Sequence, residues 1–265
     1  ESELVLSNPI SSELSVMRSS LLPGLVVAAA ANTARQQDRV RIFEASRSYH
    51  GTLEDHNEVL RLAGLITGSV LPEQWGGQTE GVDFFDIKAD VEAILALASN
   101  ANDIRFVAAE HPALQPGQSA EIVRADEVIG VLGKLHPRLA KDYDLKRAVY
   151  VFELDAAKAL ESAAPKAEII SRFTAIRRDI AVVVDDKVTA AELVEVVASA
   201  APKLIRDVRI FDIYKGDKIE EGRKSVAIGL ILQETSRTLT DDDADAALAA
   251  AITKLEDKFA AELRD

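Results

Sequence analysis

The 265-residue sequence has no cysteine, one methionine and one tryptophan. The missing cysteine excludes disulfides, thiolate zinc sites and cysteine nucleophiles, and it is typical of proteins in the reducing cytosol. No apolar run approaches the roughly 20 residues that a membrane-spanning helix needs, so we expect no membrane partner. Because the one methionine is Met17, we expect the chain to be a piece of a longer protein.

Acidic residues outnumber basic ones. The chain has 31 Lys and Arg against 44 Asp and Glu, a formal net charge of −13. This charge argues against bulk affinity for nucleic acid, and we expect no DNA binding, although it leaves room for a local basic patch. A hydrophobic content of 48% is enough for one large core or two modest ones.

A proline and small residues at 162–172 (SAAPKAEIISR) predict a linker at 164–171, between units at 1–163 and 172–265. In the first unit, hydrophobic periodicity predicts helices and antiparallel strands. These are helices at 21–35 and 84–98 and strands at 40–49, 59–67, 120–124 and 128–135. In the second unit the predicted order is βαββαβ, a split ferredoxin-like pattern. Its strands are expected near 180–184, 204–214, 224–232 and 259–263, with helices beginning after Thr189 and Thr240.

The common motifs for metal and phosphate chemistry are missing. The four histidines, which are His50, His56, His111 and His136, do not show the His-Glu-x-x-His spacing. The sequence also has no G-x-G or G-K-[ST] phosphate loop and no G-x-S-x-G nucleophile elbow. We therefore expect no metal site in this chain.

Two acids follow an apolar run in VYVFELDAAKAL, residues 149–160. Glu153 and Asp155 are separated by one residue, so on a strand they point the same way. One hypothesis is an independent enzyme that uses them as an acid–base pair, which would require an open cleft and a raised pKa. The alternative is structural: Asp155 caps the helix that follows, and Glu153 makes an ion pair.

The segment 209–225 (RIFDIYKGDKIEEGRKS) predicts a hairpin with two different faces. Alternation puts Phe211 and Ile213 in the core and Asp212 and Tyr214 on the open face. The open face of the next strand carries small residues, Ser225, Ala227 and Gly229. An exposed tyrosine beside small and polar residues is typical of single-stranded RNA binding, and the alternative is an ordinary solvated sheet face. Cations expected around this face are Arg177, Arg178, Lys215, Lys218, Arg223 and Lys224.

Several segments resemble the β subunit of bacterial phenylalanyl-tRNA synthetase. In the first unit they are NPISSELSVMRSSLLPGL (8–25) and RIFEASRSYHG (41–51). In the second they are SRFTAIRRDIAVVV (171–184), RIFDIYKG (209–216), GRKSVA (222–227) and SRTLTDDD (236–243). The resemblance implies an α+β chain: a partial class II synthetase-like antiparallel sheet domain with helices, then a ferredoxin-like anticodon-binding domain.

This family forms (αβ)2 heterotetramers in the cytoplasm that join phenylalanine to tRNA(Phe) with ATP and Mg2+. Catalysis resides in the α subunit. The resemblance therefore implies a non-catalytic chain that binds no cofactor itself, supports assembly with the α subunit and recognises the anticodon. It also implies that the first class II motif and the editing domain lie outside this chain.

The resemblance assigns roles to individual residues. Catalytic class II domains join a strand to a helix through Gly-x-Gly-x-x-Arg, which binds ATP. Here Glu153 and Asp155 occupy the glycine positions and Lys158 the arginine position, which implies a degenerate nucleotide site. Acids repel a polyphosphate, and lysine lacks the bidentate fork of arginine.

In the second unit the resemblance implies that Tyr214 stacks on an anticodon base, the guanine at the first position. Asp212 would accept hydrogen bonds from that guanine, and Ser225 would add one. Arg178 and Lys215 would contact phosphate or make structural pairs, Arg178 with Asp179. A different hypothesis is a small-molecule-sensing ferredoxin-like module on a scaffold domain, with its ligand at a sheet edge between paired copies.

Overall fold

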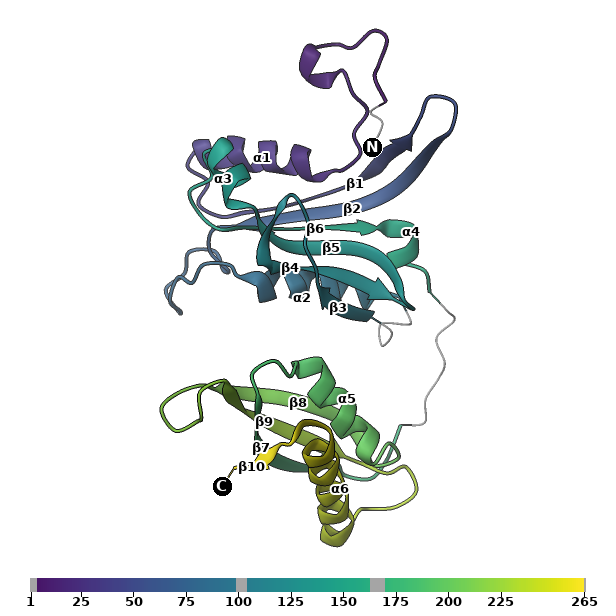
Figure 1. Ribbon diagram of the computed structural model, residues 1–265, viewed down its shortest axis with the longest axis vertical. Helices are drawn as coiled ribbons and strands as arrows, with labels where there is room; N and C mark the ends of the chain where they lie inside the picture. Colours follow the sequence, from purple (N-terminus) through teal and green to yellow (C-terminus); the bar gives the residue numbers. More distant parts are fainter. Residues whose placement is uncertain (1–3, 99–103, 163–169, 265) are drawn as a thin grey trace. The chain divides into compact units, whose positions relative to one another are not determined.

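The computed structural model describes residues 4–98, 104–162 and 170–264. It contains two compact units, 1–165 and 166–265 (Figure 1). Most of the expected linker, 164–171, lies outside the described residues. Within the described ranges, no helix is both long and apolar enough to cross a membrane.

The first unit is built on a six-stranded antiparallel sheet in the order β1-β2-β6-β5-β4-β3. The strands are β1 (Val40–Gly51), β2 (His56–Thr67), β3 (Ile104–Ala108), β4 (Leu114–Arg124), β5 (Glu127–Leu135) and β6 (Val149–Asp155). The predicted strands are confirmed, and β1, β2 and β4 are longer than their sequence patterns indicated. The sequence did not predict β3, because five residues at a sheet edge carry too little alternation to identify a strand.

Helices cover both faces of this sheet (Figure 1). The helices are α1 (Leu22–Ala34), α2 (Phe84–Leu95), α3 (Pro137–Asp142) and α4 (Ala156–Ala159), with a 3-10 turn η1 (Ser12–Leu14). Helix α1 packs on β1, β2 and β6 on one face, and α2 packs on β5 and β6 on the other. Each face therefore has its own apolar cluster.

Strand β6 runs through the middle of the sheet, and its side chains alternate between the two clusters. Val151 joins the cluster under α1, and Phe152 joins the cluster under α2. The same alternation places Glu153 and Asp155 on the α1 side, where the strand leads into α4. Glu153 lies beside the beginning of α1, and Asp155 lies at the beginning of α4.

The second unit is a four-stranded antiparallel sheet in the order β10-β7-β9-β8. Its strands are β7 (Ile176–Asp185), β8 (Ile205–Tyr214), β9 (Arg223–Leu232) and β10 (Glu262–Leu263), and its helices are α5 (Ala190–Ala200) and α6 (Asp241–Phe259). Both helices pack on the same face of the sheet (Figure 1), which leaves the other face open. The βαββαβ order is therefore confirmed.

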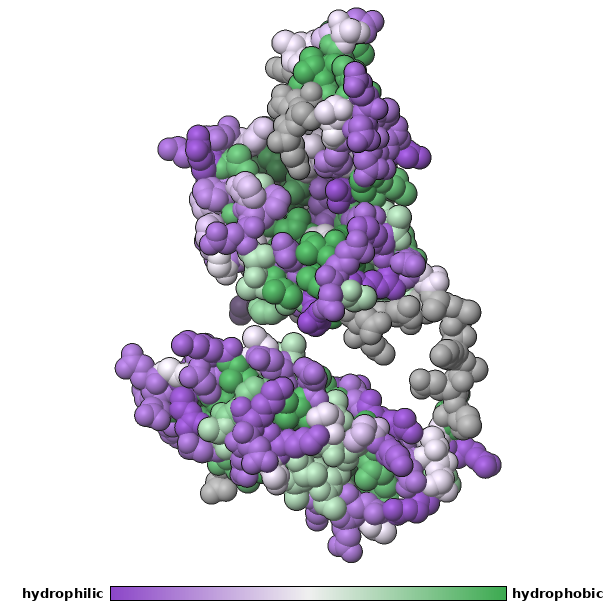
Figure 2. Space-filling model, turned by 45° about the vertical axis from the view of Figure 1, so that its right-hand side comes forward, coloured by the Kyte–Doolittle hydropathy of each residue, from purple (hydrophilic) through white to green (hydrophobic). Residues whose placement is uncertain are grey.

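The helices of this unit begin where the sequence predicts. Thr189 and Glu192 form a capping box for α5, and Thr240 and Asp243 form one for α6. The predicted last strand begins later than expected because α6 continues to Phe259. On the face seen in Figure 2, hydrophilic residues cover most of the second unit, with small hydrophobic patches among them.

Candidate functional site

The two acids of β6 border a hollow of about 480 Å3 on the α1 side of the sheet. Glu153 uses its Oε1 atom to accept hydrogen bonds from the backbone N–H of Leu21, at 2.6 Å, and from the Ser20 hydroxyl, at 3.0 Å. The carboxylate therefore holds the beginning of α1, where the helix dipole favours negative charge. The predicted ion pair of Glu153 is wrong, because its partners are neutral donors.

Asp155 caps α4, as the structural alternative predicted. Its Oδ1 atom accepts a hydrogen bond from the backbone N–H of Lys158 at 3.2 Å. The Lys158 ammonium in turn pairs with Glu127 at 2.5 Å, which raises the pKa of Lys158. The hypothesis of an independent enzyme requires that neither Glu153 nor Asp155 is engaged in a structural contact. Both acids hold helix starts, so this hypothesis is rejected.

The hollow remains open, but its lining is poor for a nucleotide. Four carboxylates and two strong cations line it: Glu110, Glu121, Glu153, Asp155, Arg61 and Lys158. Across the described ranges, no group of three or more His, Cys, Asp or Glu could hold a metal ion. The carboxylates therefore outnumber the cations in this lining, and Lys158 is already paired with Glu127, which disfavours a polyphosphate beside these acids.

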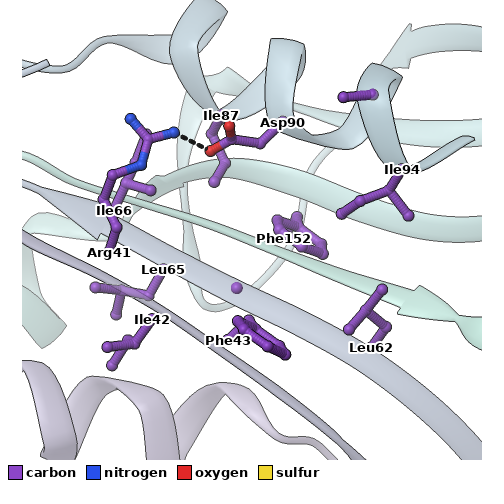
Figure 3. A pocket seen from close by; sticks show the side chains of 12 residues that line it. Arg41, Ile42, Phe43, Leu62, Leu65, Ile66, Ile87, Asp90, Ile94 and Phe152 are labelled. Atoms are coloured by element: carbon purple, nitrogen blue, oxygen red, sulfur yellow. Dashed lines mark hydrogen bonds and ion pairs between the residues drawn. The ribbon is translucent and has the colours of Figure 1, made fainter. Parts of the chain in front are cut away.

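A second hollow of about 400 Å3 lies on the opposite face, between β1, β2 and α2 (Figure 3). Phe43, Leu62, Ile94 and Phe152 line it, and Arg41 pairs with Asp90 of α2 at one end. Its lining is mostly apolar, and its one carboxylate, Asp90, is held by Arg41. The sequence did not predict this hollow.

The open face of the second unit carries the residues that the sequence predicts to bind RNA. Tyr214 pairs with Ser225 across β8 and β9, and Asp212 pairs with Ala227. Directly opposed residues share a face, and the neighbouring Val226 is buried beneath the helices. Tyr214, Asp212 and Ser225 therefore lie together on the open face, where alternation predicts them.

Two polar groups beside the tyrosine ring lack protein partners. In the part of the chain that the structure describes, neither the Asp212 carboxylate nor the Ser225 hydroxyl makes a hydrogen bond or ion pair. Ser225 is only 4% exposed and Tyr214 is 37% exposed. A ligand that stacks on the ring would find an acceptor and a hydroxyl within the same small area.

Two features around the tyrosine ring were missed from the sequence. The guanidinium of Arg264 lies 5.1 Å from the ring centre, although it follows the last strand of the unit. Gly216 packs closely against the ring: a Cβ atom at this position would lie only 2.5 Å from the Tyr214 hydroxyl. Only the tertiary fold brings Arg264 to the ring, so no local sequence signal identifies it, whereas Gly216 lies two residues after Tyr214 in the chain.

Phe211 does not lie in the core, and that prediction is wrong. The register of β8 against β9 shifts between Ile210 and Asp212, which leaves Phe211 without an opposed residue. Such a β-bulge turns an extra side chain toward one face. The ring is 54% exposed, and the guanidinium of Arg177 lies 5.1 Å from its centre.

Arg178 is directed away from this face. It is opposed to Leu230, a core residue, and binds Asp241 at 2.6 Å and Asp245 at 3.2 Å on α6. These carboxylates raise the pKa of the Arg178 guanidinium. The predicted pairing of Arg178 with Asp179 is wrong, because Asp179 pairs with a different arginine.

The other predicted cations are mostly engaged within the protein. Lys215 pairs with Asp186 at 2.5 Å, and this contact holds the pKa of the Asp186 carboxyl below its usual value. Arg223 pairs with Glu262, and Lys224 donates to the backbone carbonyl of Asp186. The expected basic ring is therefore largely neutralised by the protein's own acids.

Comparison with known proteins identifies both units. The family model described as "Phenylalanyl tRNA synthetase beta chain CLM domain" matches residues 1–156, and "Ferredoxin-fold anticodon binding domain" matches residues 171–264. The chain belongs to the phenylalanyl-tRNA synthetase β-chain family. The resemblance identified from the sequence is thereby confirmed.

The relatives in this family are named phenylalanine–tRNA ligase β subunit. The one from Pseudomonas fluorescens is 46% identical over 261 residues, and the one from Methylococcus capsulatus is 47% identical over 263 residues. In both cases the match covers 98% of this chain and 33% of the relative, so the chain spans about a third of their length. A solved pyrrolysyl-tRNA synthetase from Desulfitobacterium hafniense aligns at a TM-score of 0.42, over 60% of this chain and 52% of that one, with 13% identity.

Proposed function

We propose that this chain is a non-catalytic part of a phenylalanine–tRNA ligase β subunit and that its second unit recognises the anticodon of tRNA(Phe). One observation carries this proposal. On the open sheet face of a domain whose family model is described as anticodon binding, an exposed ring lies beside two polar groups without protein partners. These groups belong to Tyr214, Asp212 and Ser225.

The three side chains have complementary tasks. The Tyr214 ring stacks on the guanine at the first anticodon position, as aromatic side chains do with unstacked bases. Asp212 accepts hydrogen bonds from the N–H groups on the Watson–Crick edge of that guanine, because an ionised carboxylate is an acceptor only. Ser225 adds a hydrogen bond from the next strand. Adenine has fewer donors on this edge, so Asp212 favours guanine.

The cations contribute unequally. Arg178 holds the β7 strand to α6 and has a structural role, since both of its partners lie on the helix-covered side. Lys215 follows Tyr214 directly and exchanges Asp186 for an RNA phosphate. Because most cations near the open face are already paired, stacking and base contacts supply most of the affinity.

The first unit acts as a scaffold for assembly with the α subunit in an (αβ)2 enzyme of the cytoplasm. That whole enzyme uses ATP and Mg2+ to attach phenylalanine to tRNA. This chain alone binds no ATP, because the acids at its degenerate nucleotide site repel a polyphosphate. At a separation of 4 Å, each such repulsion costs about 1–4 kcal/mol in surroundings between bulk water and a protein surface.

The test is binding of this chain to an anticodon stem-loop RNA, measured by fluorescence anisotropy. Tyr214→Ala should weaken binding by about 1–3 kcal/mol, roughly 5- to 150-fold. Asp212→Asn should remove the preference for guanine over adenine at the first anticodon position. Tyr143→Ala is the matched control, because Tyr143 is 39% exposed but lies in the first unit. Equal binding of the guanine and adenine loops by the wild-type chain would contradict the proposal.

A further inference from the structure

The open face carries a second aromatic ring that the tyrosine site does not use. Phe211 is on this face because of the bulge in β8, and its ring is 54% exposed. A water-exposed phenylalanine on an open sheet is the group that single-stranded RNA-binding sheets use for stacking. Exposure alone does not distinguish it, since Phe43 and Phe85 are more exposed still.

Its surroundings distinguish Phe211 from the other exposed phenylalanines. The Arg177 guanidinium lies 5.1 Å from the ring centre, within the range of a cation–π contact. Asp179 holds that guanidinium with an ion pair of 2.7 Å. Gly229 lies beneath it, where a Cβ would be 3.2 Å from both Nε and Nη2. The arginine is therefore held close to the sheet beside the ring.

The distance between the two rings suits a splayed single strand. Phe211 and Tyr214 are three residues apart on β8. At a rise of about 3.3 Å per residue, their Cα atoms are roughly 10 Å apart along the strand. Stacked bases of one strand are only about 3.4 Å apart, so two rings at this distance hold bases that have separated from each other.

We propose that Phe211 and Arg177 form a second base-stacking platform, which holds another nucleotide of the same loop that Tyr214 binds. This inference rests on the proposed anticodon recognition. The ring stacks on the base, and Arg177, fixed by Asp179, keeps its guanidinium plane beside the ring. Because stacking tolerates every base, this platform adds affinity without selecting a base, whereas Asp212 selects guanine.

The test uses this chain and an anticodon stem-loop RNA that carries 2-aminopurine at one loop position at a time. Phe211→Ala should weaken binding roughly 10- to 100-fold and leave the preference for guanine intact. It should also restore 2-aminopurine fluorescence at one loop position other than the first of the anticodon. Phe211→Leu, which keeps an apolar side chain without a ring, should behave like Phe211→Ala. Phe85→Ala, on α2 of the first unit, is the matched control and should bind like the wild type.

The outcomes separate this inference from the proposed function. If Tyr214→Ala loses affinity while both Phe211 variants bind like the wild type, the second platform is refuted and anticodon recognition stands. If the wild-type chain binds the RNA without preference for guanine, anticodon recognition is refuted, and the platform with it. The platform would also be refuted if Phe211→Ala loses affinity but Phe211→Leu binds like the wild type. An apolar side chain without a ring would then be sufficient for binding.

Discussion

Substitution of Glu153 tests whether the acids of β6 stabilise the fold or take part in a reaction. Replacing Glu153 with alanine removes the acceptor for the Leu21 N–H and for the Ser20 hydroxyl. Leu21 is 1% exposed, so water has little access to replace the lost partner. A hydrogen bond to a charged group contributes about 1.5–3 kcal/mol, and the helix dipole adds about 0.3–1 kcal/mol. We therefore expect Glu153→Ala to lower the free energy of unfolding of the first unit by about 2–4 kcal/mol.

Differential scanning calorimetry at neutral pH measures this effect. A domain of this size loses about 2–4 °C in Tm per kcal/mol, so the first unit should unfold roughly 5–15 °C lower. Glu153→Gln keeps an acceptor oxygen and loses only the charge, so its cost should be about 1 kcal/mol. The unfolding transition of the second unit should stay unchanged and serves as an internal reference.

Glu121→Ala is the matched control for this prediction. Glu121 lines the same hollow, and among the described residues its carboxylate makes no hydrogen bond or ion pair. Its removal should change stability by no more than about 0.5 kcal/mol. If Glu153→Ala unfolds at the wild-type temperature, or if Glu121→Ala is equally destabilising, Glu153 does not stabilise the beginning of α1 and its structural role is refuted.

Three further predictions concern the second unit. Thr240→Ala removes the N-cap of α6 and should destabilise this unit by about 1 kcal/mol, measured by urea unfolding; an unchanged midpoint would show that the capping box contributes nothing. Arg237 and the cap hold the pKa of Asp243 below its ordinary 3.8, and Lys215 does the same for Asp186. Since the folded pKa values are the lower ones, this stabilisation is present above about pH 4 and is lost as the pH falls further, which acid titration followed by circular dichroism would detect and Asp243→Asn should reduce. Arg178→Ala should lower the Tm of the second unit and leave RNA affinity unchanged, and a selective loss of affinity would assign Arg178 to the RNA site instead.

Local sequence patterns were sufficient for most of the elements, though not for β3, and for the buried face of β9 in the second sheet. The alternation of Val226, Ile228 and Leu230 identified the buried side of β9, because successive strand residues point to opposite faces. The capping boxes at Thr189 and Thr240 marked the helix starts, because their hydrogen bonds join residues only three positions apart. These signals depend on neighbours in the chain and can therefore be read from it.

The sequence by itself thus determined the class of each unit, the family and the side of the sheet on which Tyr214, Asp212 and Ser225 lie. Only the tertiary structure decided which groups meet. Glu153 holds a helix start 132 residues away, and Arg264 lies over a ring on a different strand. The bulge that exposes Phe211 also appears only when β8 pairs with β9, because a register shift is a property of two strands and has no signature in either one.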